Sequence, residues 1–122
     1  MSKIAVTSEG PTLDDLVDTR FGRAAGFVVV DLESTEIRYI DNGQSQVMAQ
    51  GAGIQAAELM AGAGVSCVLT GFAGPRAFQA LSAAKIRVVQ NMEEGTTVRQ
   101  AVELFQSGAL KPADGPNRRS GR

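Results

Sequence analysis

Short apolar runs alternate along the chain with segments of helical periodicity. Runs of strand length, rich in β-branched residues, lie at Lys3–Thr7, Phe27–Asp31, Ile37–Ile40, Val65–Thr70 and Ile86–Val89. The second run is apolar without a break up to its aspartate, which predicts burial on both faces of a sheet. The third run alternates apolar and polar positions, so one of its faces should be wet. The link between these two runs, residues 32–36, is short enough to favour an antiparallel hairpin.

Three segments show the spacing of amphipathic helices, namely Ile54–Ala63, Pro75–Ala84 and Val98–Phe105. The residues expected to face the core are Ala56, Leu59, Met60 and Ala63 in the first helix and Ala77, Phe78 and Leu81 in the second. Thr97 followed by Gln100 has the spacing of a capping box at the start of the third. Gly64 and Gly108 are placed to end the first and third helices. One further helical turn is expected near Leu13–Val17.

The predicted order β-β-β-α-β-α-β-α describes an α/β protein with a mixed five-stranded sheet flanked by helices. We expect one domain over residues 1–110 and a disordered basic tail over residues 111–122, because KPADGPNRRSGR has no core residues to bury. Parallel crossovers place a binding crevice at the carboxyl ends of the strands. The loops after Thr7 and Thr70 should therefore lie at the same edge of the sheet.

The stretch Val65–Phe78, VSCVLTGFAGPRAF, has the strongest local signal for a binding site. Gly71 ends the apolar run, Phe72 and Gly74 follow, and Pro75 stands at the first helical position, where its missing N–H has no intrahelical partner to lose. The N–H groups of Arg76 and Ala77 should then point out of the helix start. An open helix N-terminus favours an anion, and the charge of Arg76 adds to this preference.

Two more loops are candidates for the same site. The first is Ser8–Arg23, in which Ser8 and Gly10 precede two arginines, Arg20 and Arg23, whose guanidinium groups suit delocalised anions. Its alternative interpretation is a solvated loop with Phe21 inserted in the core. The second is Asn42–Gly53, where Gly51 and Gly53 allow close backbone approach at a helix start, and the alternative is a flexible linker. Met48 in this loop could offer a soft thioether to Cu(I).

Composition excludes several classes of site. The chain of 122 residues has no histidine, which removes histidine-based nucleophilic catalysis and the commonest transition-metal ligand, and its single cysteine, Cys67, forms no internal disulfide. Mid-strand, Cys67 is expected to be a buried structural thiol rather than a metal ligand. The run Asp14, Asp15 and Asp18 is expected to be a solvated face rather than a cation site.

Charge and hydropathy indicate which partners and which cellular location to expect. The tail from Lys111 carries four basic residues and one acidic residue, so the body holds a net charge of −4 within a total of −1. An acidic body argues against a nucleic-acid binder. No apolar run approaches the ~20 residues that cross a bilayer, and the N-terminus has no signal-peptide pattern. We therefore expect a cytoplasmic protein without a membrane segment.

Nucleotide motifs are weak or missing. Residues 51–56 match the dinucleotide fingerprint G-x-G-x-x-A, but the preceding strand ends about ten residues upstream, whereas the fingerprint follows directly on a strand. No phosphate-binding P-loop sequence occurs. The candidate site thus has glycines, arginines and open N–H groups but no base–nucleophile pair, which predicts binding of an anion rather than catalysis.

Four ordered segments, KIAVTSEG, RFGRAAGFVVVD, GAGIQAAELMAGAGVSCVLTGFAGPRAFQAL and GTTVRQAVELFQSG, together resemble the dinitrogenase iron–molybdenum cofactor biosynthesis family over Lys3–Gly108. The resemblance implies a ribonuclease-H-like fold and non-catalytic binding of a sulfide-bridged metal cluster. It is strongest to a branch whose members carry an anionic molybdenum–copper sulfide cluster without covalent protein ligands. Some nitrogenase-accessory members of the family look as if they use histidine at the cluster. The lack of histidine here favours a molybdenum–copper sulfide cluster over an iron–molybdenum–sulfur cluster or precursor.

The cluster-binding residues that the resemblance and the loop chemistry together indicate are Ser8, Gly10, Arg20, Arg23, Met48, Gly51, Gly53, Gly71, Phe72, Gly74 and Arg76. Expected partners are the metal–sulfide cluster and proteins that receive it or respond to it, with a monomeric carrier. A two-metal nuclease is an alternative from another class, but it needs carboxylates on the first strand, and Lys3–Thr7 has none. A small anion- or nucleotide-sensing module that acts through a partner protein is the other alternative.

Overall fold

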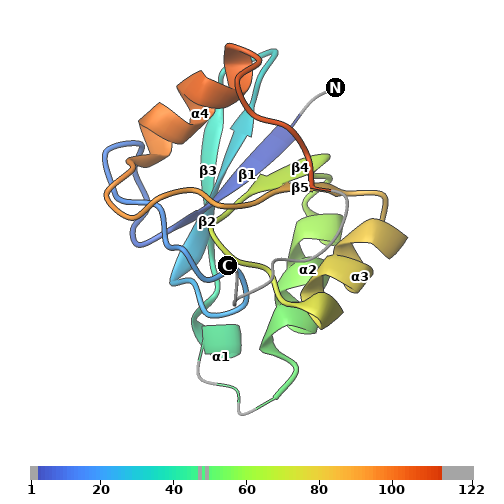
Figure 1. Cartoon of the computed structure of the whole chain (residues 1–122). Helices are drawn as coiled ribbons and strands as arrows, with labels where there is room; N and C mark the ends of the chain where they lie inside the picture. Colours follow the sequence, from blue (N-terminus) through green and yellow to red (C-terminus); the bar gives the residue numbers. More distant parts are fainter. Residues whose placement is uncertain (1–2, 47, 49, 114–122) are drawn as a thin grey trace.

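The computed structural model describes residues 3–46, 48 and 50–113. A five-stranded mixed sheet forms the centre of the molecule (Figure 1). Its strands, at nearly the predicted positions, are β1 (Lys3–Ser8), β2 (Gly26–Asp31), β3 (Ile37–Asp41), β4 (Cys67–Leu69) and β5 (Arg87–Val89). The fourth strand is shorter than the predicted Val65–Thr70, although the Ser66 N–H still donates to the Lys3 carbonyl and the Thr70 N–H to that of Val89.

The strand order is β3-β2-β1-β4-β5, with β1 at the centre. Strand β1 pairs antiparallel with β2 and parallel with β4, and β2 pairs antiparallel with β3 as the short link 32–36 predicts. Strands β4 and β5 are parallel. The sheet is thus an antiparallel half joined to a parallel half along β1, and the carboxyl ends of β1, β4 and β5 lie at one edge. The ribonuclease-H-like designation stays a prediction.

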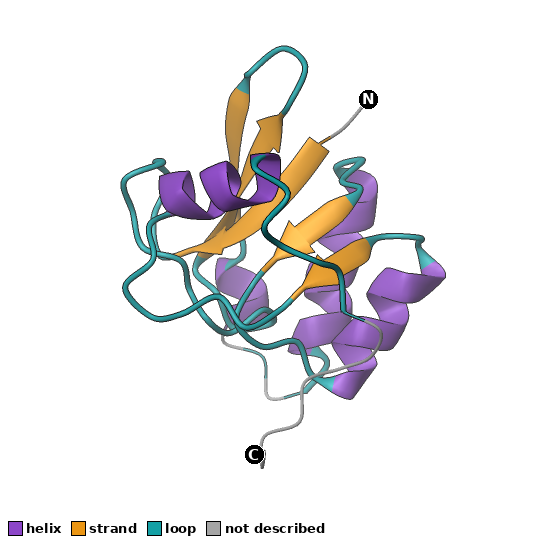
Figure 2. Ribbon diagram, turned by 45° about the horizontal axis from the view of Figure 1, so that its top comes forward, coloured by secondary structure: helices purple, strands orange, loops and turns teal. Residues whose placement is uncertain are grey.

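Helices cover both faces of the sheet (Figure 2). Helices α2 (Ala52–Gly62) and α3 (Pro75–Ala83) pack together on one face, and α4 (Val98–Gln106) lies on the other. Thr97 forms the predicted capping box with Gln100. The prediction of a loop over Asn42–Gly53 was wrong in one respect, because Gly43–Gln46 forms a short helix, α1. It follows Asn42, whose carbonyl accepts from the Gln46 N–H.

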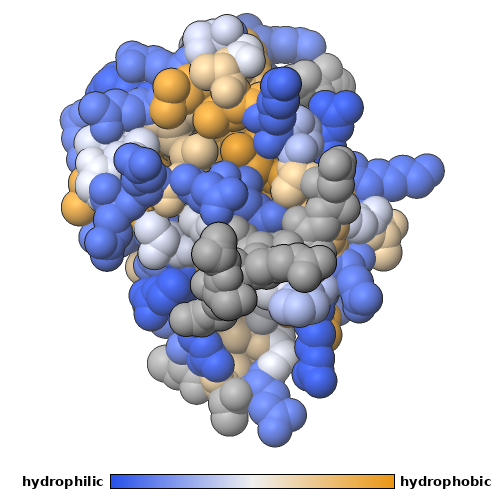
Figure 3. Space-filling view, in the orientation of Figure 1, coloured by the Kyte–Doolittle hydropathy of each residue, from blue (hydrophilic) through white to orange (hydrophobic). Residues whose placement is uncertain are grey.

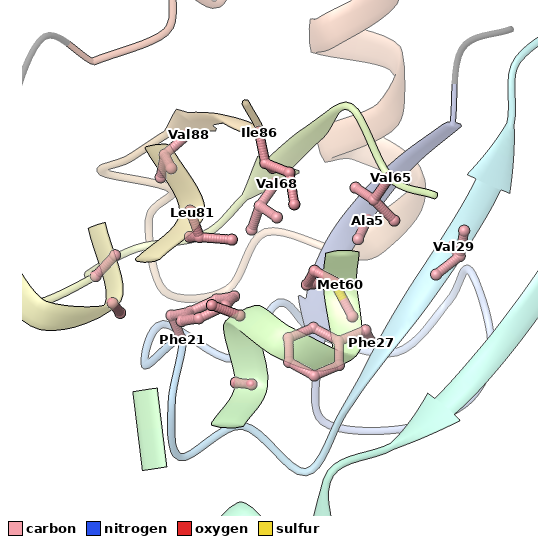
Figure 4. Packing of buried hydrophobic residues seen from close by; sticks show 14 residues of the cluster. Ala5, Phe21, Phe27, Val29, Met60, Val65, Val68, Leu81, Ile86 and Val88 are labelled. Carbon is pink, nitrogen blue, oxygen red and sulfur yellow. The ribbon is translucent and has the colours of Figure 1, made fainter. Parts of the chain in front are cut away.

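Alternating side chains on the strands divide the core into two layers. On the α2–α3 side, Phe27 and Val29 of β2 join Ala5, Val68 and the inward residues of both helices (Figure 4). On the α4 side, Ile4 and Val6, with Val28 and Val30, pack against Val98, Ala101 and Val102. Strand β2 is therefore buried on both faces, as its continuous apolar run predicts. Phe21 is inserted in the first layer at 5.6 Å from the Phe27 ring, so this part of the loop packs in the core.

The helical turn predicted near Leu13–Val17 does not form. This segment is extended where it contacts its neighbours, since Val17 bridges Ser8 at the end of β1 and Leu16 bridges Thr97. The Val17 N–H donates to the carbonyl of Thr96, a residue 79 positions later in the sequence. Long-range pairing with the start of α4 thus prevails over the local helical spacing.

The segment that follows α4 contacts both the core and strand β5. Leu110 packs against the α4-side core, and the Ala113 N–H donates to the Val88 carbonyl at 2.7 Å. Ala113, the third residue of the predicted disordered tail, is therefore hydrogen-bonded to the edge strand of the sheet. Residues 114–122 of that tail lie outside the described residues.

Within the described part of the chain, none of the helices combines the length and the apolar character that crossing a membrane requires. On the face shown in Figure 3, apolar surface gathers in the upper part of the molecule near α4, with hydrophilic side chains around it. A hollow of about 210 Å³ between α4 and the β2–β3 link is lined by apolar residues such as Leu13, Leu32 and Ile37 and by as many polar or charged residues, such as Asp31 and Arg99.

Candidate functional site

A cleft of about 700 Å³ opens at the edge of the sheet where the three predicted loops meet. It is lined by residues from the loop after β1, from the start of α2 and from the β4–α3 loop: Arg20, Phe21, Gly22, Arg23, Gln50, Gly51, Ala52, Gly53, Phe72, Gly74, Pro75, Arg76 and Ala77. The three loops are separated in sequence but share this one cavity, as expected from the position of the crevice in parallel α/β units. Among the residues that the structure describes, three arginines and no acidic residue line the cleft.

Two helix N-termini open into the cleft. Helix α2 begins after Gly51 and helix α3 after Gly74, and neither N-cap residue forms a side-chain hydrogen bond to its helix. Neither first turn contains an acidic residue. Pro75 occupies the first turn of α3 as the sequence predicts. Both helices therefore present uncapped N–H groups and the positive ends of their dipoles to the cavity, an arrangement that stabilises negative charge.

Glycines allow the three loops to approach so closely. A Cβ atom on Gly22 would lie 2.9 Å from the backbone N and Cα of Gly53, and one on Gly53 would lie 2.9 Å from the Cβ of Ala77. Real side chains do not tolerate such distances. Gly51 has a second requirement, because its φ of 78° is in the left-handed region that glycine adopts without strain. The cleft is thus assembled by backbone contacts that larger residues would separate.

Arg20 enters the cleft while paired to Asp18. Its Nε and Nη2 donate to the two Asp18 carboxylate oxygens at 3.2 Å each, and its backbone N–H donates to Oδ1 at 3.0 Å. The hydrogen bond and charge of Asp18 raise the pKa of Arg20 further above its ordinary value. Asp18 itself is anchored by its backbone, since its carbonyl accepts from the Thr7 hydroxyl at 2.6 Å. This network fixes Arg20 relative to the end of β1.

The other two arginines differ in their contacts. Arg23 uses Nη1 to donate to the carbonyl of Gln46 at 3.1 Å and to that of Met48. Arg76 is exposed at the start of α3, and its guanidinium group makes no hydrogen bond or ion pair with any residue that the structure describes. Arg76 is therefore the cleft arginine with the greatest freedom to contact a ligand.

Four predicted site residues do not line the cleft. Ser8 is fully buried, and its hydroxyl donates to the Gly10 carbonyl at 2.5 Å; Gly10 packs against the Asp15 carboxylate. Gly71 packs against Thr19 and lines an adjoining hollow of about 630 Å³ that shares Arg20 and Phe72 with the cleft. Met48 has its Cε 3.6 Å from the position of a Cβ on Gly51, so its methyl group lies next to the cleft wall.

Some residues that belong to the site by geometry are not predicted from the sequence. The most important is Asp18, which was predicted to be on a solvated face with Asp14 and Asp15 but is 4% exposed. Asp14 does lie at the surface, where Arg99 pairs with it at 3.1 Å. Local spacing could not separate these aspartates, because only the long-range pairing of the loop with β1 buries one of them. The lining residues that are not among the eleven predicted cluster-binding residues are Phe21, Gly22, Gln50, Ala52, Pro75 and Ala77.

The side chains provide little for direct metal coordination. Within residues 3–46, 48 and 50–113, histidine, cysteine, aspartate and glutamate form no group of three or more that could hold a metal ion. Cys67 is buried at 3% exposure on the opposite layer of the core, and burial raises the pKa of its thiol to about 11. It is therefore a neutral core thiol, as predicted. A ligand in the cleft would be held by charge and hydrogen bonds.

Comparison with known proteins identifies relatives over nearly the whole chain. The family model described as "Dinitrogenase iron-molybdenum cofactor" matches residues 1–108. An uncharacterised protein of Methanocaldococcus jannaschii is 28% identical over 104 residues, which cover 83% of this chain and 86% of that protein.

Two solved structures share the fold and much of the sequence. The apo form of the orange protein from Desulfovibrio gigas is 58% identical, covers 97% of this chain and 98% of its own, and superposes with a TM-score of 0.93. A Thermotoga protein of the DUF35 family, named as a candidate NifB protein, is 29% identical, covers 98% of this chain and 100% of its own, and gives a TM-score of 0.84.

Proposed function

Since this chain belongs to the dinitrogenase iron–molybdenum cofactor family, we propose that it binds and carries an anionic molybdenum–copper sulfide cluster. The cluster is cargo held without covalent protein ligands. The alternative cargo within the same class is an iron–molybdenum–sulfur cluster or its precursor. The proposal includes a monomeric, cytoplasmic carrier that delivers its cargo to a protein partner.

The observation that carries this proposal is the charge of the cleft. In the part of the chain that the structure describes, three arginines and no acidic residue line it, and two uncapped helix N-termini open into it. A bulky sulfide anion spreads its charge over several weakly basic sulfur atoms. Arginine suits such an anion because its guanidinium group is itself delocalised and more weakly hydrated than an ammonium group. Electrostatic attraction of this kind retains a multiply charged ligand without a metal–protein bond.

The same lining argues for a carrier rather than an enzyme. Apart from the arginines, the lining side chains are phenylalanine, glutamine, alanine and proline, with glycines between them. None of these residue types is an ordinary general base or nucleophile at neutral pH. We therefore propose a non-catalytic role.

Cluster uptake tests the proposal directly. Cu(I) and tetrathiomolybdate are added to the apo-protein, the mixture is desalted, and the visible charge-transfer absorption of the protein fraction is measured. We expect the colour to stay with the protein. In Arg76→Gln the affinity for the cluster should fall about tenfold, since one charge-assisted contact is worth ~1.5 kcal/mol or more. The matched control is Arg38→Gln, an exposed arginine on β3 outside the cleft lining. A colourless protein fraction would contradict the proposal.

A second candidate function for the same cleft is that of an anion- or nucleotide-sensing module that acts through a partner protein. Uncapped helix N-termini bind phosphate groups as readily as other anions, and this is the specific observation in its favour. Calorimetry with nucleoside di- and triphosphates separates the two functions. Heat of binding for a nucleotide, together with no retention of thiomolybdate, would favour the sensor.

A further inference from the structure

Arg23 both donates hydrogen bonds to the segment before α2 and accepts one from it. Its Nη1 donates to the carbonyls of Gln46 and Met48, and the Gln46 Nε2 donates back to the Arg23 carbonyl at 3.2 Å. The same arginine lines the cleft, together with Gly51 at the start of α2. One residue therefore touches both the space for a ligand and the chain segment beside it.

The guanidinium group can serve both at once. It carries five N–H donors in a rigid fork, and the two carbonyls take only those on Nη1. The donors on Nε and Nη2 make no hydrogen bond to a described residue. An anion in the cleft can accept from these donors while the carbonyls keep theirs. A lysine could not do so, because its ammonium group lacks the planar fork that directs donors to two sides.

The Met48 methyl group is placed to report a change in the conformation of this segment. Its Cε is 3.6 Å from the position that a Cβ on Gly51 would take, and Gly51 is the N-cap of α2. The methyl group therefore adjoins the cleft wall. Met60 and Met92 are buried in the two core layers, at 0% and 7% exposure.

We propose that Arg23 is a positioning residue that couples occupation of the cleft to the placement of Gln46, Met48 and Gly51. This inference rests on the proposed function, because the ligand is the anionic sulfide cluster. When the cluster binds, its charge holds the guanidinium group, and the guanidinium group holds the two carbonyls more firmly. By thermodynamic linkage the reverse also applies, so a well-held segment raises the affinity for the cluster.

Methyl NMR of protein labelled with ¹³C at the methionine methyl groups tests the coupling. On addition of tetrathiomolybdate with Cu(I), we expect the Met48 signal to shift and sharpen while those of Met60 and Met92 stay in place. In Arg23→Lys the charge remains but the bridge is lost, so the cluster should still bind, more weakly, and the Met48 signal should no longer sharpen.

Gln46 offers a variant outside the cleft. Gln46 does not line the cavity, and its side chain is joined to Arg23 by the hydrogen bond from Nε2 to the Arg23 carbonyl. Gln46→Ala removes this bond, which helps to hold Arg23 against the segment, and should lower cluster affinity about fivefold, within the range of couplings between sites. The matched control is Gln79→Ala, an exposed glutamine on α3 outside the lining, which should have no effect.

The outcomes distinguish this inference from the function on which it rests. If the wild-type chain retains no thiomolybdate, both are overturned. If it retains thiomolybdate but the Met48 signal is unchanged, or Gln46→Ala binds as tightly as the wild type, the coupling is overturned and the carrier function stands. A shift of Met48 that is identical in Arg23→Lys overturns the role of the guanidinium fork.

Discussion

Arg20 and Asp18 form an ion pair that is buried on one side only, with the Asp18 side chain 6% exposed and the Arg20 side chain 60% exposed. The distance from Arg20 Nε to Asp18 Oδ1 is 3.2 Å. A carboxylate that is so nearly excluded from water is costly to bury unless a partner compensates its charge. Arg20 therefore has two tasks, because it satisfies Asp18 and also faces the cleft, and part of its charge is already neutralised.

Substitution of Arg20 should lower stability as well as binding. In Arg20→Gln the buried Asp18 loses both side-chain donors, and we expect the free energy of unfolding to fall by about 1–2 kcal/mol, less than for a fully buried pair because water screens the exposed guanidinium group. Denaturant unfolding measures this loss. Asp18→Asn in the same chain should recover part of it, since no charge is then left unpaired. Arg76→Gln is the control, with an expected change within ~0.5 kcal/mol. Equal losses in the two arginine variants would contradict this account.

Two glycines on one helix provide a matched test of loop packing. A methyl group on Gly53 would meet the Ala77 Cβ at 2.9 Å, whereas one on Gly62 has no atom outside its own helix within 4 Å. We expect Gly53→Ala to destabilise the fold by about 1–3 kcal/mol by overpacking and to weaken cluster binding by separating α2 from α3. Gly62→Ala should stabilise by up to ~1 kcal/mol through helix propensity. Thermal unfolding and cluster uptake of both variants are the measurements, and unchanged uptake in Gly53→Ala would show that the cleft tolerates separation.

Stability should decline at high pH through Cys67. Burial raises the pKa of the folded-state thiol from 9.0 to about 11, so the folded state keeps the proton that the unfolded state releases. The contribution of this thiol is complete below about pH 9 and is lost between about pH 9 and pH 11, by an amount of ~2–3 kcal/mol at most. Since Tyr39 also has a pKa raised by burial, the informative quantity is the difference between wild type and Cys67→Ala across this range. A difference independent of pH would contradict the assignment.

Two truncations separate the contact at the sheet edge from the remaining tail. A chain that ends after Leu110 loses the hydrogen bond from the Ala113 N–H to the Val88 carbonyl, and its free energy of unfolding should fall by about 1 kcal/mol. A chain that ends after Ala113 keeps this bond and should unfold like the full-length protein. Thermal scans of the three lengths give the comparison. Equal midpoints for both truncations would mean that the contact contributes nothing.

Much of the fold follows from local sequence signals. Pro75 at the start of a helix, the Thr97–Gln100 capping box and the unbroken apolar run of β2 each have a local physical cause, and each occurs in the structure where the sequence predicts it. The meeting of three loops in one cleft was also predictable, because parallel strands bring their following loops to one edge. Seven of the eleven predicted site residues line that cleft.

The remainder depends on contacts between distant segments. The spacing of Leu13–Val17 is compatible with a helix, yet the bond from the Val17 N–H to the Thr96 carbonyl holds it extended. Asp18 looks like its neighbours Asp14 and Asp15 in sequence, and only the backbone contact to Thr7 brings it inside. The use of Arg23 as a donor to carbonyls could not be read from its charge, which suggested only a contact to an anion.

The position of β1 at the centre of the sheet sets the order in which the molecule can be completed during synthesis. Its partner β2 follows closely in the chain, but its other partner, β4, does not exist until residue 69 has left the ribosome, since Val6 pairs with Leu69. Until then one edge of β1 is unpaired, and the part of the cleft opposite Arg20 and Arg23 that comes from the β4–α3 loop has not formed. The loops of Gly53 and Arg76 join them only after both parallel crossovers close, a late event for contacts so distant in sequence. If the cleft holds a cluster as proposed, a nascent or half-folded chain has no complete site for it, and only fully folded molecules can be loaded.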